Sequence, residues 1–73
     1  MIKNKDTAKQ ISDLMLEIGS KLNQSAVLVR DTCEANEFEA YRGVVGQLMG
    51  TMFLEVMNPL YSVHLELTPN ELK

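Results

Sequence analysis

The sequence predicts an all-α protein, an antiparallel hairpin of two helices with a short C-terminal extension. Apolar residues recur at steps of three and four over two long stretches, which is the spacing of one helix face. A helix-start signal at Asn36 separates the two stretches. Only the last part of the chain alternates with the period of a strand, and a single strand has no partner edge. Residues 1–73 are therefore expected to form one small helical domain.

The first helix is expected over residues 7–34. Asp6 or Thr7 can cap its start, and a helix of this length would be ~42 Å long. Gly19, followed by Ser20, marks the place where a kink or break would fall, because glycine is a poor helix former. The apolar stripe consists of Ile11, Met15, Ile18, Leu22, Ala26, Val29 and Cys33, widened by Ala8 and Leu14.

The second helix is expected over residues 37–57. Asn36 can cap it, and Glu39 completes a capping box three residues later. The helix should end near Asn58, because Pro59 has no amide hydrogen to donate and disfavours the helical conformation in the residue before it. A short connection between the two helices makes them antiparallel neighbours. The apolar stripe consists of Phe38, Tyr41, Val45, Leu48, Met52 and Val56.

The segment 59–67 fits two patterns. Its apolar residues alternate with polar ones as in a half-buried strand, yet four of its residues also share a helical face, with Pro59 at the first helical position. Because nothing else in the chain resembles a strand, we expect a short helix rather than an extended tail. A second helix-start signal follows, made of Thr68, Pro69 and Glu71 with Leu67 and Leu72 as a staple. It marks either one terminal turn or the start of a further helix.

The small size of the chain predicts association. A folded protein of 8.2 kDa exposes ~4,500 Å² and hides only about 60% of its unfolded surface, so chains of this size usually need further stabilisation. The single cysteine, Cys33, cannot form an internal disulfide, and the single histidine, His64, cannot build a zinc cage. A partner chain remains, most simply a second copy that completes a four-helix bundle with two-fold symmetry.

A candidate interface lies on the side of the second helix that faces away from its apolar stripe. Its three glycines fall within about 60° of one another on a helical wheel, and glycines at this spacing let two helix backbones approach closely. Alternatively, they accommodate bulky side chains of the first helix. Three exposed glycines would destabilise the helix by roughly 2–3 kcal/mol relative to alanine, so a packing role is expected. The interface residues are Gly43, Gly46, Gly50, Phe53, Leu54 and Met57.

Residues that carry catalysis are sparse. Cys33 lies on the apolar stripe, so we expect a buried apolar residue, and Asp31 and Glu34 are the opposite of the electropositive surroundings that a reactive thiol needs. His64 has no second imidazole or thiol near it in sequence. The chain lacks a phosphate-binding glycine loop, a nucleophile elbow and paired cysteines. We therefore expect no enzymatic activity, no cofactor, no metal and no small-molecule substrate.

Charge and hydropathy narrow the class of partner. The net charge of −3 makes nucleic acid an unlikely partner, since such binding depends on neutralising phosphates, and any basic partner would favour the acidic second half. The apolar run 43–57 includes Gln47 and Glu55 and is shorter than the roughly 20 residues that span a membrane. The N-terminal segment lacks the apolar core of a signal peptide, which indicates a cytoplasmic protein.

These observations favour a non-catalytic protein–protein interaction module. We expect a small adaptor, chaperone or regulator that uses apolar helix faces to bind itself, another helical protein, or both. One alternative is a dimeric nucleic-acid-binding regulator that uses Lys3, Lys5 and Lys9 together. A weaker alternative is a redox sensor or small enzyme built on Cys33.

Overall fold

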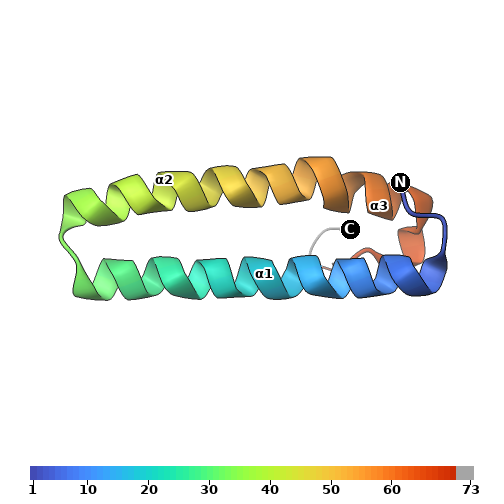
Figure 1. The fold of residues 1–73 in the computed structure, drawn as a ribbon, viewed down its shortest axis with the longest axis horizontal. Coiled ribbons are helices and arrows are strands. Elements are labelled where there is room, and N and C mark those ends of the chain that lie inside the picture. The colour runs from blue at the N-terminus through green and yellow to red at the C-terminus, as the bar shows by residue number, and fades with distance from the viewer. Residues whose placement is uncertain (71–73) are drawn as a thin grey trace.

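A computed structural model of the protein describes residues 1–70, and every regular element in this range is a helix. The two long helices lie side by side and antiparallel in a rod of 44 × 19 × 16 Å (Figure 1). The all-α prediction is confirmed. In chain order, the elements are α1 (Lys5–Thr32), α2 (Ala35–Thr51), a π-helical segment (Met52–Met57), α3 (Asn58–Val63) and a 3-10 turn (Leu65–Leu67).

Helix α1 begins and ends two residues earlier than expected. The side chain of Asn4 accepts a hydrogen bond from the backbone amide of Thr7 at 2.9 Å, so Asn4 is the cap and the predicted capping by Asp6 or Thr7 is wrong. The first turn is wholly polar, so the apolar spacing could not locate it. The helix passes Gly19 without interruption and ends at Thr32.

Two residues, Cys33 and Glu34, connect α1 to α2. Glu34 precedes the first turn of α2 and makes no side-chain capping bond, so the predicted capping box of Asn36 and Glu39 is wrong. Such a short connection turns the chain into α2 already at Ala35, which leaves Asn36 inside the first turn. Glu39 instead accepts a hydrogen bond from its own helix at 3.0 Å, donated by Arg42.

The sequence predicted that the second helix would end near Asn58, before Pro59. The chain instead stays helical through this position. The ring of a proline conflicts with the carbonyl four residues earlier, here that of Glu55, so a helix can pass only where its geometry changes locally. The π-helical segment provides this change, because its turns are wider; the amide of Asn58 reaches back five residues to the carbonyl of Phe53. The chain then continues as α3 and reverses at His64.

The residues of the tail are helical, as expected, and include no strand up to Asn70. They form two short pieces rather than one helix over 59–67, because the backbone of His64 leaves the helical region with φ −123° and ψ 73°. Part of the second helix-start signal, Glu71 and Leu72, lies outside the described residues.

The buried core is concentrated at the end of the hairpin where α3 meets the start of α1. Leu60 and Ala8 are fully buried there, and Met57 and Tyr61 are nearly so. Towards the Cys33 end, no residue of α1 after Ser12 is buried, and α2 contributes only Val45. The partly buried residues that pack against the core are Ile2, Ile11, Met15 and Leu67.

Polar contacts tie three segments together at this end. The buried hydroxyls of Ser12 and Tyr61 lie 2.5 Å apart and join α1 to α3. His64 is buried, and its Nε2 lies 2.7 Å from the carbonyl oxygen of Ile2, which can only accept, so Nε2 donates. Both contacts bridge residues far apart in the sequence, so they fix how the ends of the chain fold back on the hairpin.

Glu66 adds an exposed ion pair to this end. Its carboxylate lies 3.6 Å from Nζ of Lys5 and 3.8 Å from Nδ1 of His64. The pKa of Glu66 is lowered, first by a hydrogen bond from its own backbone amide and then by the charges of Lys5 and His64.

We predict that the hydroxyl pair is energetically coupled. Tyr61→Phe or Ser12→Ala leaves the other hydroxyl buried without a partner, which should lower the free energy of unfolding by about 1–3 kcal/mol in each case. The double variant should lose less than the two single variants together, by at least about 0.5 kcal/mol. Urea denaturation of the four proteins measures this, with Ser62→Ala as a control for an exposed hydroxyl. Strictly additive losses would contradict the contact.

We also predict a small acid-dependent loss of stability from Glu66. Because its folded pKa is lower than its unfolded pKa, the stabilisation is complete above the unfolded value and is lost as the pH falls through the folded value. Glu66→Gln should therefore unfold with a flatter pH dependence on the acid side than the unaltered protein. Thermal melts between neutral and acid pH measure the difference, and parallel curves for the two proteins would contradict it.

Candidate functional site

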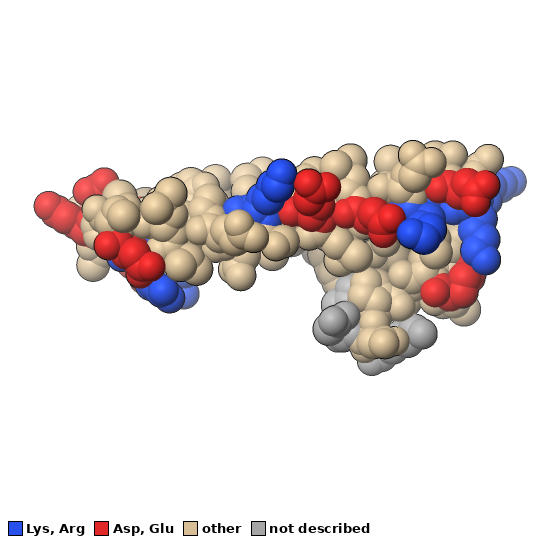
Figure 2. Space-filling model, turned by 90° about the horizontal axis from the view of Figure 1, so that it is seen from below, with Lys and Arg blue, Asp and Glu red and all other residues tan. Residues whose placement is uncertain are grey.

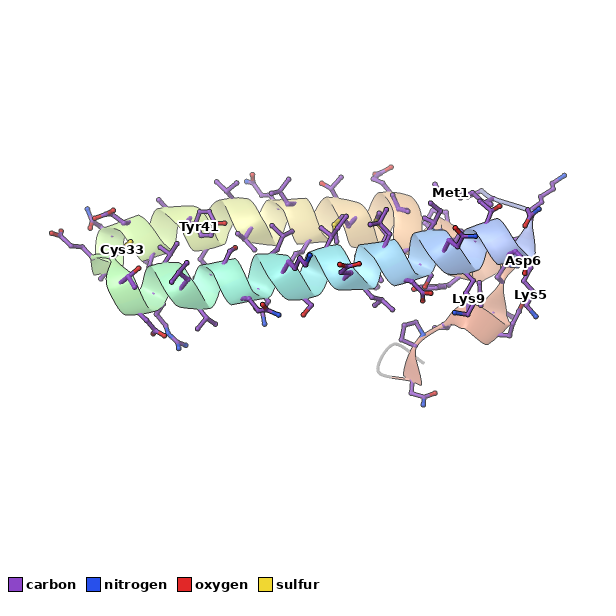
Figure 3. The ribbon with its side chains drawn as sticks, turned by 60° about the horizontal axis from the view of Figure 1, so that its bottom comes forward. Met1, Lys5, Asp6, Lys9, Cys33 and Tyr41 are labelled. Atoms are coloured by element: carbon purple, nitrogen blue, oxygen red, sulfur yellow. The ribbon has the colours of Figure 1, made fainter. Side chains whose placement is uncertain are left out.

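A groove runs between the two long helices on one side of the hairpin. It consists of two hollows of about 440 and 280 Å³ that meet at Met49. Gly19 and Val27 belong to its α1 wall, and Gly46 and Phe53 to its opposite wall. The segment after α3 projects from the hairpin (Figure 3), and Pro69 of that segment lines one end. We call this feature the helix–helix groove.

Methionine is concentrated in the larger hollow of this groove. Four of the five methionines of the chain line it: Met15, Met49, Met52 and Met57. Their unbranched thioether side chains adapt to partners of different shape. Gly19 adjoins them, and a β-carbon at this position would lie 3.9 Å from the terminal methyls of Met49 and Met52. Gly19, where the sequence suggested a kink or break in α1, therefore lies in the groove wall.

Two arginines lie at the end of the groove nearer the Cys33 connection. Arg30 of α1 and Arg42 of α2 are the only charged residues among the described residues that line the groove. Arg30 Nε contacts Asp31 at 3.0 Å, and Arg42 Nη2 contacts Glu39 at 3.0 Å. Both arginines line the groove, whereas neither Asp31 nor Glu39 is among its described lining residues. The Arg42 guanidinium also lies 5.9 Å from the centre of the Phe38 ring.

Apolar side chains are also exposed on the opposite side of the hairpin. Leu14 and Leu28 of α1 and Val44 and Leu48 of α2 are each at least 45% exposed. Leu48 belongs to the stripe that was expected to pack against α1, and it is half exposed instead. A hydrogen bond of 2.8 Å between the hydroxyls of Ser25 and Tyr41 crosses between the helices here.

The six predicted interface residues fall into two groups. Gly46, Phe53 and Met57 line the groove, whereas Gly43, Gly50 and Leu54 lie towards the outer side of α2 and the π-helical segment. Met57 is only 7% exposed because it belongs to the core, so little of it is available to a partner.

The glycines of α2 serve no packing role that the described part of the chain shows. A β-carbon added at Gly43, Gly46 or Gly50 would have no neighbouring atom within 4 Å. The interpretation that these glycines accommodate bulky side chains of the first helix is therefore wrong. Leu54, close to them in sequence, is 61% exposed.

Cys33 is exposed, which contradicts its expected place in the core. Helix α1 ends at Thr32, and the extended backbone of Cys33 takes its side chain off the apolar stripe. Its thiol lies 3.6 Å from the Thr32 hydroxyl. Its neighbours in the chain include the acidic residues Asp31 and Glu34, which do not supply the electropositive surroundings that a reactive thiol needs.

The other candidates for chemistry are dispersed. Lys5 pairs with Glu66 and Lys9 with Asp13 at 3.1 Å, so these lysines do not form an unopposed basic patch with Lys3. On the face that Figure 2 shows, acidic and basic side chains lie close to one another along the hairpin, without a large patch of basic residues. Within residues 1–70, no three acidic, histidine or cysteine side chains come together as metal ligands, and no helix combines the length and apolar composition needed to cross a membrane.

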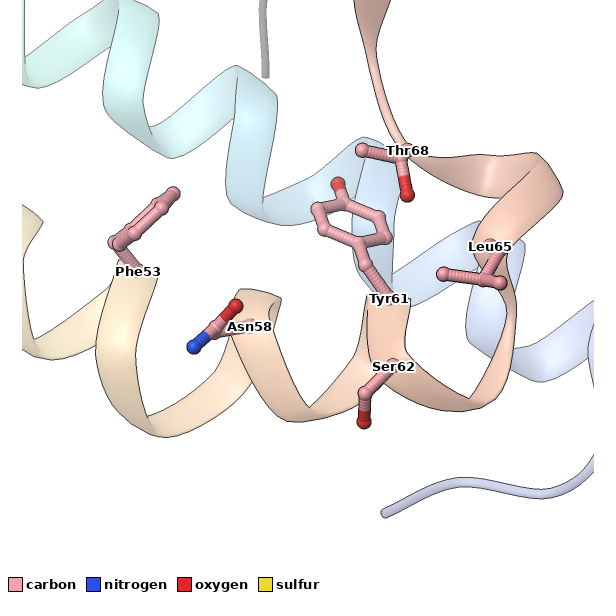
Figure 4. A pocket seen from close by; sticks show the side chains of 6 residues that line it. All are labelled: Phe53, Asn58, Tyr61, Ser62, Leu65 and Thr68. Carbon is pink, nitrogen blue, oxygen red and sulfur yellow. The ribbon is translucent and has the colours of Figure 1, made fainter. Parts of the chain in front are cut away.

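A third hollow of about 300 Å³ lies beside the tail (Figure 4). Its lining includes Phe53 of the π-helical segment, Tyr61 of α3, and Leu65 and Thr68 of the segment that follows α3. The Tyr61 hydroxyl is engaged with Ser12, and no charged residue is among the described lining residues. This hollow offers neither a nucleophile with a base nor a charged anchor for a ligand.

Comparison of the chain with protein-family models, curated proteins and solved structures found no match. The geometry and chemistry of the chain's own residues therefore carry the functional argument.

We predict that Cys33 reacts with thiol reagents in the native protein. Because its side chain is exposed, labelling by an aromatic disulfide reagent should proceed at a rate within about tenfold of that in denaturant, with Cys33→Ser as the blank. Reaction only after denaturation would contradict the exposed placement.

Proposed function

We propose that the protein is a non-catalytic protein–protein interaction module that associates with itself. It would act in the cytoplasm as a small adaptor, chaperone or regulator that holds another helical chain against its apolar surfaces. The support is physical: apolar side chains are exposed on both sides of the hairpin, and the helix–helix groove has walls that are almost free of charge. No described cluster of side chains supplies competing support for catalysis.

The observation that carries this proposal is the surface area of the chain. The accessible surface is 5265 Å², whereas a compact monomer of this mass exposes ~4,500 Å². The excess is about 750 Å², close to the roughly 800 Å² that each partner buries in a stable interface. A second copy is the simplest source of that cover, and two hairpins related by a two-fold axis form a four-helix bundle.

For the contact between copies we propose the outer side of α2. Gly43 and Gly50 would let a partner helix approach closely, with Leu54 exposed beside them and Gly46 at the edge. Exposed glycine destabilises a helix by about 0.5–1 kcal/mol relative to alanine, and nothing in the described protomer offsets this cost. Close packing of a second chain against the glycines would offset this cost.

One double variant distinguishes a monomer from a dimer, because its expected effect on stability is opposite in the two cases. In a protein that remains a monomer, Gly43→Ala with Gly50→Ala should raise the free energy of unfolding by about 1–2 kcal/mol, because alanine favours the helix. In a dimer that crosses at these glycines, the added methyl groups should push the copies apart. We expect a lower dimer mass fraction by analytical ultracentrifugation and a lower melting temperature.

Gln24→Leu is the matched control, because it changes an exposed position on the other long helix. It should leave the mass unchanged, and the unaltered protein should melt at a higher temperature when it is more concentrated. A stable monomer at every concentration would overturn self-association. A dimer that Gly43→Ala and Gly50→Ala leave intact would move the contact to another face.

A further inference from the structure

The helix–helix groove has the length and shape to receive one more helix. On α1 it extends from Met15 to Arg30, which corresponds to ~22 Å of helix and therefore to a ligand helix of about 15 residues. Gly19 on one wall and Gly46 on the other have no side chains, which leaves room for a third helix. A third helix there would pack against both long helices at once.

The charges of the groove are placed at one end only. Arg30 and Arg42 come from opposite walls, and Asp31 and Glu39 pair with them from outside the lining. Each of these exposed pairs uses one guanidinium nitrogen and stabilises the fold little, so the arginines remain able to bind another carboxylate. A ligand with carboxylates at this end would lie beside two arginines and would meet no acidic side chain among the described lining residues.

We infer that the groove binds one amphipathic helix of another protein, with acidic side chains at the helix end that lies against Arg30 and Arg42. The inference rests on the proposed function, because it names the chemistry of the partner. Met15, Met49 and Met52 of the larger hollow would pack against the apolar face of that helix. A dimer formed through Gly43, Gly50 and Leu54 leaves the groove open, because these residues do not line it.

The net charge of the chain predicts a basic ligand, whereas the two arginines predict an acidic one. Comparing an acidic with a basic helix therefore tests the inference. A protein of net charge −3 should attract a basic helix and repel an acidic one at long range. At contact distance, however, the nearest charges dominate, because salt screens exposed charges beyond about 8–10 Å. Tighter binding of an acidic helix than of a basic helix would therefore show that the two arginines act on the ligand.

The probes are synthetic helical peptides of about 15 residues, the length that the groove accommodates. Each carries leucines at one helical face on an alanine and glutamine background. One peptide has three glutamates at one end and its counterpart has three lysines, and both are made in both chain directions. Binding is measured by fluorescence anisotropy and located by the methyl resonances of the methionines. Met15, Met49, Met52 and Met57 report on the groove, and Met1, which does not line it, is the internal control.

We expect the glutamate peptide to bind about fivefold to tenfold more tightly than the lysine peptide and to shift the groove methyls but not Met1. Arg30→Glu combined with Arg42→Glu should reverse the preference. Lys9→Glu combined with Lys21→Glu is the matched control, because it makes the same change in net charge and disrupts two exposed pairs outside the groove. This control should keep the preference for glutamate.

Two results would overturn the inference: groove methyls that no peptide shifts, or equal or tighter binding of the lysine peptide. Either result is independent of self-association, which ultracentrifugation measures on the same samples. If the protein is a dimer that binds no peptide, self-association is supported and the inferred helical partner is wrong. If it is a monomer that binds the glutamate peptide, self-association is wrong and the groove is supported as a partner site.

Discussion

Two helices packed side by side can bury only the narrow strip between them, and the rest of this structure depends on that constraint. Each helix has one neighbour, so most of its circumference stays exposed. The chain gains a true core only where α3 and the tail add a third layer against α1, around Leu60 and Tyr61. Elsewhere the hairpin is held by half-buried side chains and by one buried valine, Val45. The stability of the fold is therefore concentrated at the end where α3 meets the start of α1.

The same constraint explains why apolar residues remain at the surface. Helix α2 and the π-helical segment carry apolar or small residues on nearly every side, whereas one neighbouring helix can cover only one side. A larger protein would cover the other sides with its own elements, but 73 residues do not suffice. The surface exposed in excess of a compact monomer is comparable to one half of a protein–protein interface, which supports the proposed association.

Helical periodicity predicted the two long helices and most of the inward residues, because the period depends only on local geometry. Helix ends were less predictable, since Asn4 and Cys33 take roles that depend on how the chain enters and leaves α1. The candidate site was predicted only in part for a related reason. A helical wheel assumes a constant angular step, and the wider π turns shift following side chains by up to one position, or about 100°. Met57 thereby reaches the core instead of the expected surface.

The groove could not be predicted from either helix alone, because it depends on how the helices pair. In the structure Arg42 pairs with Glu39 on the surface of α2, and Arg30 lies in the last turn of α1, where a cation interacts favourably with the helix dipole. Neither local role indicates a groove. Only the antiparallel pairing brings them to opposite walls of one hollow. The chain has few basic residues, yet the fold places two of them on opposite walls at one end of the groove. The charged end of the groove is thus a property of the packing, and it gives the groove a polarity that its apolar walls lack.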